Sequence, residues 1–261
     1  MIKGHLLDIF SWIVAISLLL LNQQKEGVVV LDVGQGDSIL IQKDNVQILI
    51  DGGEDDSVLY QLAKYMPYGD MEIEVVVLTH PHSDHLGGLF YIFERYAVGE
   101  VWFNDIDYES AIYQYFLELE IPRREVVEGE MYRIEDWVLE VLFASDEVYD
   151  RDLNANNASI VLQLDTNVHT FLFMGDAEVE EERYLMEKGV LQEIDILKAG
   201  HHCSKTASSD IFLDIVEPEV AICSYGKENK FGHPHIETIE RFESRNIQIL
   251  STEKEGNIWA L

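Results

Sequence analysis

The sequence predicts a mixed α/β (α+β) protein built as a four-layer αββα sandwich. Each half of the chain opens with short β-branched runs and continues with apolar runs that alternate with stretches of helical spacing. No proline-rich linker, low-complexity block or short repeat divides residues 27–261, so we expect them to form one domain. With 47% hydrophobic and 26% charged residues, a chain of 261 residues can bury a full core.

The first half is expected to begin as an antiparallel meander. Three β-branched runs, at Val28–Val33, Ser38–Gln42 and Val46–Ile50, are separated by turn-forming residues. Helical spacing follows at Ser57–Tyr65, and Ile73–Leu78 is an apolar run, interrupted only by Glu74, that indicates a buried strand. This strand ends directly at a group of histidines.

The second half repeats the layout. Strands are expected at Trp137–Phe143, Ser159–Leu164, Thr170–Met174, Ile194–Lys198 and Val220–Cys223. Helices are expected at Ala177–Lys188 and Ile236–Glu243. The last two strands each lead into a loop that contains histidines.

Residues 1–26 contain a hydrophobic leader. An apolar run of 13 residues, Ile9–Leu21, follows Lys3 and is interrupted by two serines. This length suits the core of an export signal better than a full membrane span. Because no small-x-small cleavage site follows, we expect an uncleaved anchor that holds the protein outside the membrane. An extracytoplasmic protein, anchored or secreted, is therefore predicted, and a short buried helix is the alternative.

The charge balance restricts the partners that the protein can bind. Lys and Arg number 18 against 49 Asp and Glu, which gives a formal net charge of -31. Such a surface repels long anionic polymers, and nonspecific affinity for nucleic acid comes mainly from basic residues. A small anionic substrate such as a phosphodiester is expected, and single-stranded nucleic acid remains open if metal ions assist its binding.

The chain has two cysteines, Cys203 and Cys223, and neither belongs to a Cys-x-x-Cys pair. This spacing excludes a zinc knuckle and a disulfide framework. Two alternatives stay open, one disulfide between them or two buried free thiols.

The densest group of candidate metal ligands lies directly after the strand at Ile73–Leu78. His80 and His82 alternate in an extended loop, so their side chains point the same way and can share one ion. Asp84 and His85 begin a new turn and can reach a second ion. Three imidazoles and a carboxylate within six positions have the density of a metal site.

Later residues are expected to complete this site. Seven of the nine histidines fall in three clusters, which are His80, His82 and His85, then His201 and His202, then His233 and His235. Each later cluster follows a predicted buried strand, and parallel strands gather their sites at their carboxyl ends. Asp176 also ends an apolar strand, where a bridging carboxylate would fit.

These motifs resemble the metallo-β-lactamase superfamily, through His-x-His-x-Asp-His at residues 80–85 and Gly-Asp at 175–176. Further segments resemble the extracytoplasmic hydrolase domain of ComEC-type DNA-uptake proteins over residues 27–261. They are Leu-Asp-Val-Gly-Gln-Gly-Asp-Ser at 31–38, Asp-Gly-Gly at 51–53, Asn-Asn-Ala-Ser at 156–159, Gly-His-His at 200–202 and Gly-His-Pro-His at 232–235. The resemblance covers the hydrolase domain and implies no role in moving DNA.

The resemblance implies two divalent ions, zinc or manganese. It implies His80 and His82 on one ion, Asp84 and His85 on the other, Asp176 as the bridging ligand and His233 as the last ligand. With Asp84, the expected catalytic residues are His201 and His202, which resemble histidines that face the scissile phosphate, although His201 and His233 could exchange roles. The residues expected to contact substrate are Asn157, which lies where many relatives have a third histidine, and His235.

Four further positions bear on the site. Cys203 stands where the family usually has glycine and is interpreted as a packed small residue or a reactive thiol. Asp32, Asp37 and Asp51 flank glycine turns, and each could form a turn or support a histidine, but none is counted as a ligand.

The sequence therefore predicts a metal-dependent hydrolase, most simply a phosphodiesterase or nuclease that uses a metal-activated water. The first alternative is hydrolysis of an ester, a lactone or a phosphoester of the cell envelope, because a fold does not determine the substrate. An alternative of another class is a noncatalytic metal-binding module of an envelope complex. Filling of both metal sites together with turnover would distinguish an enzyme from such a module.

Overall fold

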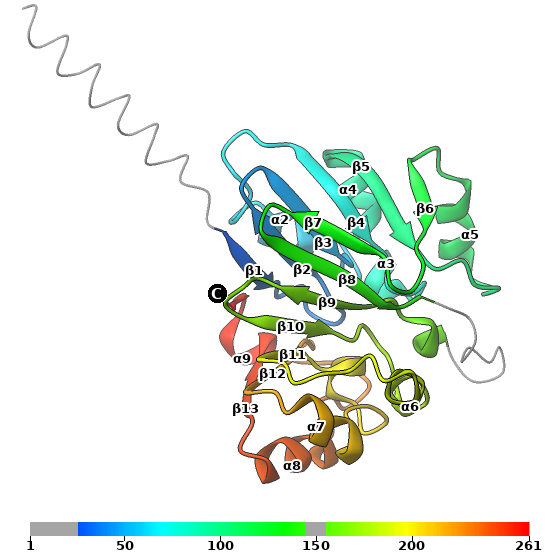
Figure 1. Cartoon of the computed structure of the whole chain (residues 1–261). Coiled ribbons are helices and arrows are strands. Elements are labelled where there is room, and N and C mark those ends of the chain that lie inside the picture. Colours follow the sequence, from blue (N-terminus) through cyan, green and yellow to red (C-terminus); the bar gives the residue numbers. More distant parts are fainter. Residues whose placement is uncertain (1–25, 145–154, 261) are drawn as a thin grey trace, which may run out of the picture.

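The computed structural model describes residues 26–144 and 155–260. In this part of the chain two seven-stranded sheets lie face to face, with helices on the outer side of each sheet (Figure 1). The first sheet comes mainly from the amino-terminal half, with β14 added from the end of the chain, and the second comes from the carboxyl-terminal half. The predicted four-layer αββα sandwich is confirmed.

The first sheet has the strand order β14-β1-β2-β3-β4-β5-β6. Its strands are β1 (Gly27–Val30), β2 (Ile39–Lys43), β3 (Val46–Ile50), β4 (Glu72–Val77), β5 (Ala97–Phe103), β6 (Arg123–Glu125) and β14 (Ile258–Trp259). Strands β1, β2 and β3 pair antiparallel, as the predicted meander requires, whereas β3 to β6 pair in parallel. The parallel part brings the carboxyl end of β4, and the histidines that follow it, to one edge of the sheet.

The second sheet has the strand order β13-β12-β11-β10-β9-β8-β7. Its strands are β7 (Met131–Ile134), β8 (Trp137–Phe143), β9 (Val161–Asp165), β10 (Thr170–Phe173), β11 (Ile196–Lys198), β12 (Val220–Cys223) and β13 (Gln248–Ser251). Strands β7 to β10 are antiparallel, and β10 to β13 are parallel. The carboxyl ends of β10, β11 and β12 therefore lie side by side.

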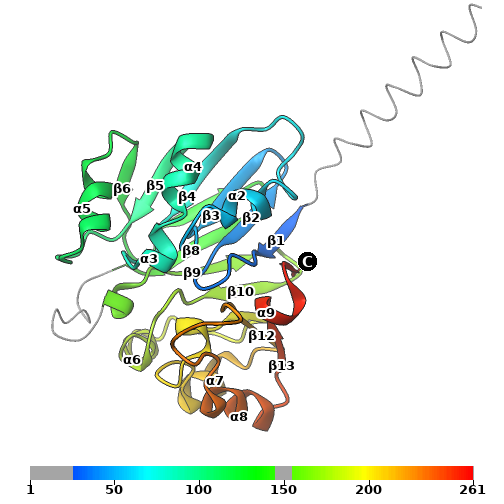
Figure 2. The ribbon, with the colours of Figure 1, turned by 180° about the vertical axis from the view of Figure 1, so that it is seen from behind.

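Helices cover the outer faces of both sheets (Figures 1 and 2). Those of the first half are α2 (Ser57–Leu62), α3 (Ser83–Leu86), α4 (Leu89–Arg95) and α5 (Ala111–Glu118). Those of the second half are α6 (Val179–Lys188), α7 (Asp210–Val216), α8 (Ile236–Ser244) and α9 (Thr252–Glu255), with short 3-10 turns η1 (Ala155–Ala158) and η2 (Gly200–Cys203).

Strand alternation builds the layers of the core. In β1, Val28 and Val30 face the second sheet and join the central cluster, whereas Val29 packs under the helices of the first half. A third cluster lies between the second sheet and its helices, around Phe212 and Phe242. Both faces of each sheet are thus covered, so the apolar runs of the sequence are buried on both sides.

Several elements differ from the sequence prediction. Strands β5, β6, β7, β13 and β14 and helices α7 and α9 have no predicted counterpart. The expected leader lies almost entirely outside the described residues. Within residues 26–144 and 155–260, no helix has the length and apolar character needed to cross a membrane.

Candidate metal centre

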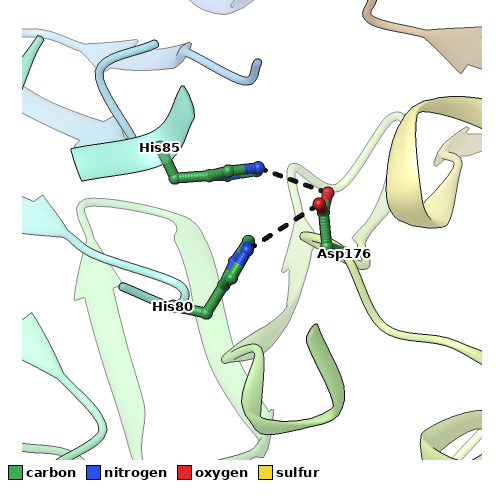
Figure 3. Close-up of side chains that lie close together, drawn as sticks. All are labelled: His80, His85 and Asp176. Atoms are coloured by element: carbon green, nitrogen blue, oxygen red, sulfur yellow. Dashed lines mark ion pairs between the residues drawn. The ribbon is translucent and has the colours of Figure 1, made fainter. Parts of the chain in front are cut away.

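Loops from both halves of the fold bring histidines and carboxylates to the edge where the parallel strands end. Figure 3 shows His80 and His85, from the first half, both directed at Asp176, which follows β10. His80 Nε2 lies 3.7 Å from Asp176 Oδ2, and His85 Nε2 lies 3.3 Å from Asp176 Oδ1. All three side chains are buried. His82 joins them, because its Nδ1 lies 3.0 Å from His80 Nε2.

His202 completes the group from the second half. Its Nε2 lies 3.4 Å from Asp84 Oδ2 and 3.3 Å from Asp176 Oδ2. Helix α3 places Asp84 and His85 on the same short turn, as the sequence predicts for residues that begin a new turn. Asp176 thus lies between the histidines of the first half and His202, which is the position of a shared carboxylate.

His201 and His233 lie beside this group. His201 Nε2 is 4.0 Å from Asp176 Oδ2, while its Nδ1 pairs with Glu178 Oε1 at 2.8 Å. The ring of His233 lies 5.3 Å from that of His201 and 5.7 Å from that of His202. Among the described residues, the groups compact enough to hold an ion include His202 but neither His233 nor His82. The role of last ligand that the resemblance implies for His233 stays a prediction, and His202 is a second candidate for it.

The two predicted substrate contacts lie outside the cavity. Asn157 Oδ1 accepts a hydrogen bond from the backbone N–H of Glu178, because η1 packs against the start of α6. His235 precedes α8, and its Nδ1 accepts the backbone N–H of Lys205. Asn156, which the sequence analysis did not single out, lines the cavity instead.

Two buried aspartates support the histidines. Asp51 Oδ2 accepts a hydrogen bond from His85 Nδ1 at 2.8 Å and another from Thr79 Oγ1 at 2.7 Å. Such a contact directs the other ring nitrogen, Nε2, toward Asp176. Of the two interpretations left open for Asp51, the structure therefore favours support of a histidine.

Asp37 supports His202 and is itself paired with a buried lysine. Asp37 Oδ1 lies 3.3 Å from His202 Nδ1, which also contacts the carbonyl oxygen of Ser224 at 2.9 Å. The second oxygen of Asp37 lies 2.5 Å from Nζ of Lys198, and both side chains are 1% exposed. Sequence reasoning missed Lys198, because it recognised only the strand that ends there.

The electrostatic environment is that of a cation site. Burial would lower the pKa of His85 and of His202, but the surrounding carboxylates outweigh burial and raise both pKa values well above the usual range. Burial would raise the pKa of Asp176, but His202 and His85 hold it well below its ordinary value. The carboxylates at the centre thus attract positive charge.

The donor atoms fit divalent metal ions. Within the described residues, three buried atoms at the centre form no hydrogen bond, namely His85 Nε2, His202 Nε2 and Asp176 Oδ1. Unsatisfied buried polar atoms are costly, and a metal ion would satisfy all three. Imidazole nitrogens with carboxylate oxygens suit zinc and also accommodate manganese.

The loop that carries His201 and His202 has an unusual backbone. His201, His202 and Cys203 have φ angles of 45°, 53° and 63°, a region that costs free energy for residues other than glycine. A disulfide joins Cys203 to Cys223 at the end of β12, with their Cα atoms 5.5 Å apart. Of the alternatives left open for the cysteines, the structure has the disulfide.

The centre lies in a cavity of about 480 Å³. Asp84, Asp176 and His202 line it, together with His201 and His233. Reactive groups of a bound molecule could therefore reach the same atoms that would hold metal ions.

The sequence-family model described as Metallo-beta-lactamase superfamily matches residues 31–227 of the chain. The chain belongs to the metallo-β-lactamase superfamily. Among curated proteins, ComE operon protein 3 of Bacillus subtilis is 28% identical over 250 residues. These residues cover 87% of this chain and 32% of the relative, so the chain spans about a third of that protein's length. The predicted resemblance to ComEC-type proteins is confirmed.

Solved structures of the metallo-β-lactamase fold agree with this assignment. YhfI from Bacillus subtilis aligns with a TM-score of 0.57 at 12% identity and covers 87% of this chain and 96% of its own. A diphosphatase of the PhnP family aligns with a TM-score of 0.51 at 15% identity and covers 86% of this chain and 95% of its own. At these identities the likeness shows the fold alone.

Proposed function

We propose that the protein is a metal-dependent phosphodiesterase. The observation that carries the proposal is Asp176, which lies between His80 and His85 on one side and His202 on the other, at the floor of an open cavity. A carboxylate shared by two sets of histidines suits a pair of divalent ions. The diphosphatase with the same fold acts on a phosphate compound, which is consistent with this substrate class.

Two divalent ions, zinc or manganese, would be held by residues from both halves of the fold, namely His80, His82, Asp84, His85, Asp176 and His202. When bound, such ions activate a water molecule and stabilise charge on phosphoryl oxygens. The anionic phosphodiester would thereby be drawn into an otherwise acidic protein.

His201 is the residue that we assign to proton transfer. Its side chain lines the cavity and is 22% exposed, so it can reach a bound substrate. Glu178 accepts a hydrogen bond from its Nδ1 and orients the ring, which leaves Nε2 to donate a proton to the leaving oxygen. A neighbouring carboxylate also compensates the charge of the protonated ring.

We further propose that the protein acts outside the cytoplasm, held at the membrane by residues 1–26. The support is the leader composition together with the disulfide, since disulfides persist in oxidising compartments. Small anionic phosphodiesters, and short single strands of nucleic acid, are the substrates that we expect there.

The test measures metal content and hydrolysis of bis-p-nitrophenyl phosphate with Mn²⁺ or Zn²⁺, on the full-length chain. We expect two bound ions, and Asp176→Asn or Asp84→Asn should lose metal and at least about 100-fold in kcat. The control is His169→Ala, because His169 is a half-exposed histidine outside the cavity. Bound metal without phosphodiester turnover would favour another ester, and absence of metal under all conditions would refute the proposal.

A further inference from the structure

A second hollow adjoins the active-site cavity. Four residues line both, namely Gln35, Ser83, Asp84 and Phe231. The two hollows therefore form one groove that continues away from the metal centre between the start of α3 and the loop after β12. A small diester would fill the first hollow, which leaves the second for a further part of the substrate.

Phe231 stands where the two hollows meet. Its ring is stacked on His233, with 5.7 Å between ring centroids and 19° between the planes, yet Phe231 remains 61% exposed. Leaving an aromatic ring in water is unfavourable, and an exposed aromatic ring beside a reactive centre is a surface for stacking.

The loop that carries Phe231 is held in place. The side-chain amide of Asn229 donates to the carbonyl oxygens of Gly226 and His233, and its oxygen accepts the backbone N–H of His233. Because these three hydrogen bonds span the loop, Phe231 is presented in a defined position, and stacking on it would cost little ordering entropy.

The remaining walls of the second hollow are polar. Lys230 is the one cationic side chain among the residues that line it, and it is exposed. Gln35 donates to Asp84 Oδ2 at 3.3 Å, while its Oε1 is buried without a partner among the described residues. Glu54 and Glu228 also line the hollow and suit hydrogen-bond donors such as amino or hydroxyl groups. An aromatic ring, a cation and acceptors together match a nucleotide.

We infer that the second hollow is a subsite for the nucleotide next to the scissile phosphate, with its base stacked on Phe231 and its phosphate near Lys230. This inference rests on the proposed phosphodiesterase activity. It makes the preferred substrate an oligonucleotide of at least two units, in single-stranded form, because a base must be free to stack.

The experiment compares kcat/KM of the full-length chain on an oligothymidylate and on an abasic oligomer of equal length. Phe231→Ala should lower kcat/KM on the oligothymidylate about tenfold, mainly through KM, and leave the abasic oligomer unchanged. Phe231→Trp should retain the preference for bases. Tyr68→Ala is the matched control, because Tyr68 is 89% exposed and lies outside both hollows.

If Phe231→Ala lowers kcat/KM equally on both oligomers, or lowers it on neither, the proposed subsite is wrong. Thymidine p-nitrophenyl phosphate, assayed in parallel, separates the two claims. If it is hydrolysed but Phe231→Ala shows no base-dependent effect, the subsite is wrong and the phosphodiesterase stands. If neither thymidine p-nitrophenyl phosphate nor the oligomers are hydrolysed, the proposed phosphodiesterase activity is wrong, and the proposed subsite is wrong with it.

Discussion

At the scale of single residues, a buried ion pair connects the two sheets beneath the metal centre. Lys198 ends β11 of the second sheet, and Asp37 belongs to the loop before β2 of the first. The carbonyl oxygen of Ala199 accepts a further hydrogen bond from Lys198 Nζ at 2.9 Å. Asp37 in turn contacts His202, so this pair links the packing of the sheets to the position of a candidate ligand.

Replacing Lys198 should lower the stability of the protein. Lys198→Met leaves Asp37 buried without its strongest partner, and we expect a loss of about 3 kcal/mol in the free energy of unfolding. Denaturant unfolding measures this loss. Lys64→Met, at an exposed lysine on the surface, should change stability by less than about 0.5 kcal/mol.

The double variant Lys198→Met/Asp37→Leu decides whether the pair acts as a unit. Because it removes both buried charges, it should be more stable than Lys198→Met alone. The single variant Asp37→Leu is measured as well. If the double variant loses as much free energy of unfolding as the two single variants together, Lys198 and Asp37 do not act as a unit.

Some residues of the candidate site could be predicted from the sequence, and others could not. His80, His82 and His85 were predictable, because they lie within six positions of one another and after a recognisable strand. The pairing of Lys198 with Asp37 was not, because it depends on how two sheets meet. Spacing alone also could not distinguish His202 from His233, since both follow buried strands.

At the scale of secondary structure, the predicted elements are those with a strong apolar pattern. Strand β4 was predicted from its run of apolar residues, which only Glu74 interrupts. Its two neighbours in the sheet, β3 and β5, pair with it in parallel. Strand β6 consists of Arg123–Glu125, three charged residues at the edge of a sheet, and carries no such pattern. Strand β5 contains Gly99 and begins with partly exposed residues, so its alternation is weak.

Turn η2 carries two histidines of the candidate metal centre, His201 and His202. Three successive residues with positive φ, His201 to Cys203, direct two histidines toward the cavity. Glycine would suit this backbone at the third position, whereas here the residue is Cys203, which a disulfide joins to β12. A covalent link thus compensates for a residue that disfavours the conformation.

Reduction of this disulfide should lower stability. The cysteines are 20 positions apart, and closing a loop of this length is worth about 3 kcal/mol in the chain-entropy model. Denaturant unfolding with and without dithiothreitol measures the difference, and Cys203→Ala/Cys223→Ala should be insensitive to the reductant. Two reactive thiols in the native, unreduced protein would show that the bond is absent, and would also weaken the proposal of an extracytoplasmic location.

At the scale of the whole molecule, the charge and the proposed substrate oppose each other. The chain carries a formal net charge of -31, whereas an oligonucleotide carries one negative charge per phosphate. Metal ions bound at the centre would offset this repulsion only locally, since a charge in salt solution acts over about 8 to 10 Å. The remaining acidic surface should slow the approach of a polyanion and affect a small diester far less.

This conflict predicts an inverted salt dependence. For most proteins that bind nucleic acid, affinity falls as salt rises, because bound cations are released from the phosphates. Here we expect kcat/KM on an oligothymidylate to rise several-fold between about 20 and 200 mM NaCl, because salt screens the repulsion. Thymidine p-nitrophenyl phosphate, with a single charge, should show little change over the same range at constant Mn²⁺. A decrease with salt for the oligomer would mean that local cations such as Lys230 dominate its approach, and that the net charge does not control access to the groove.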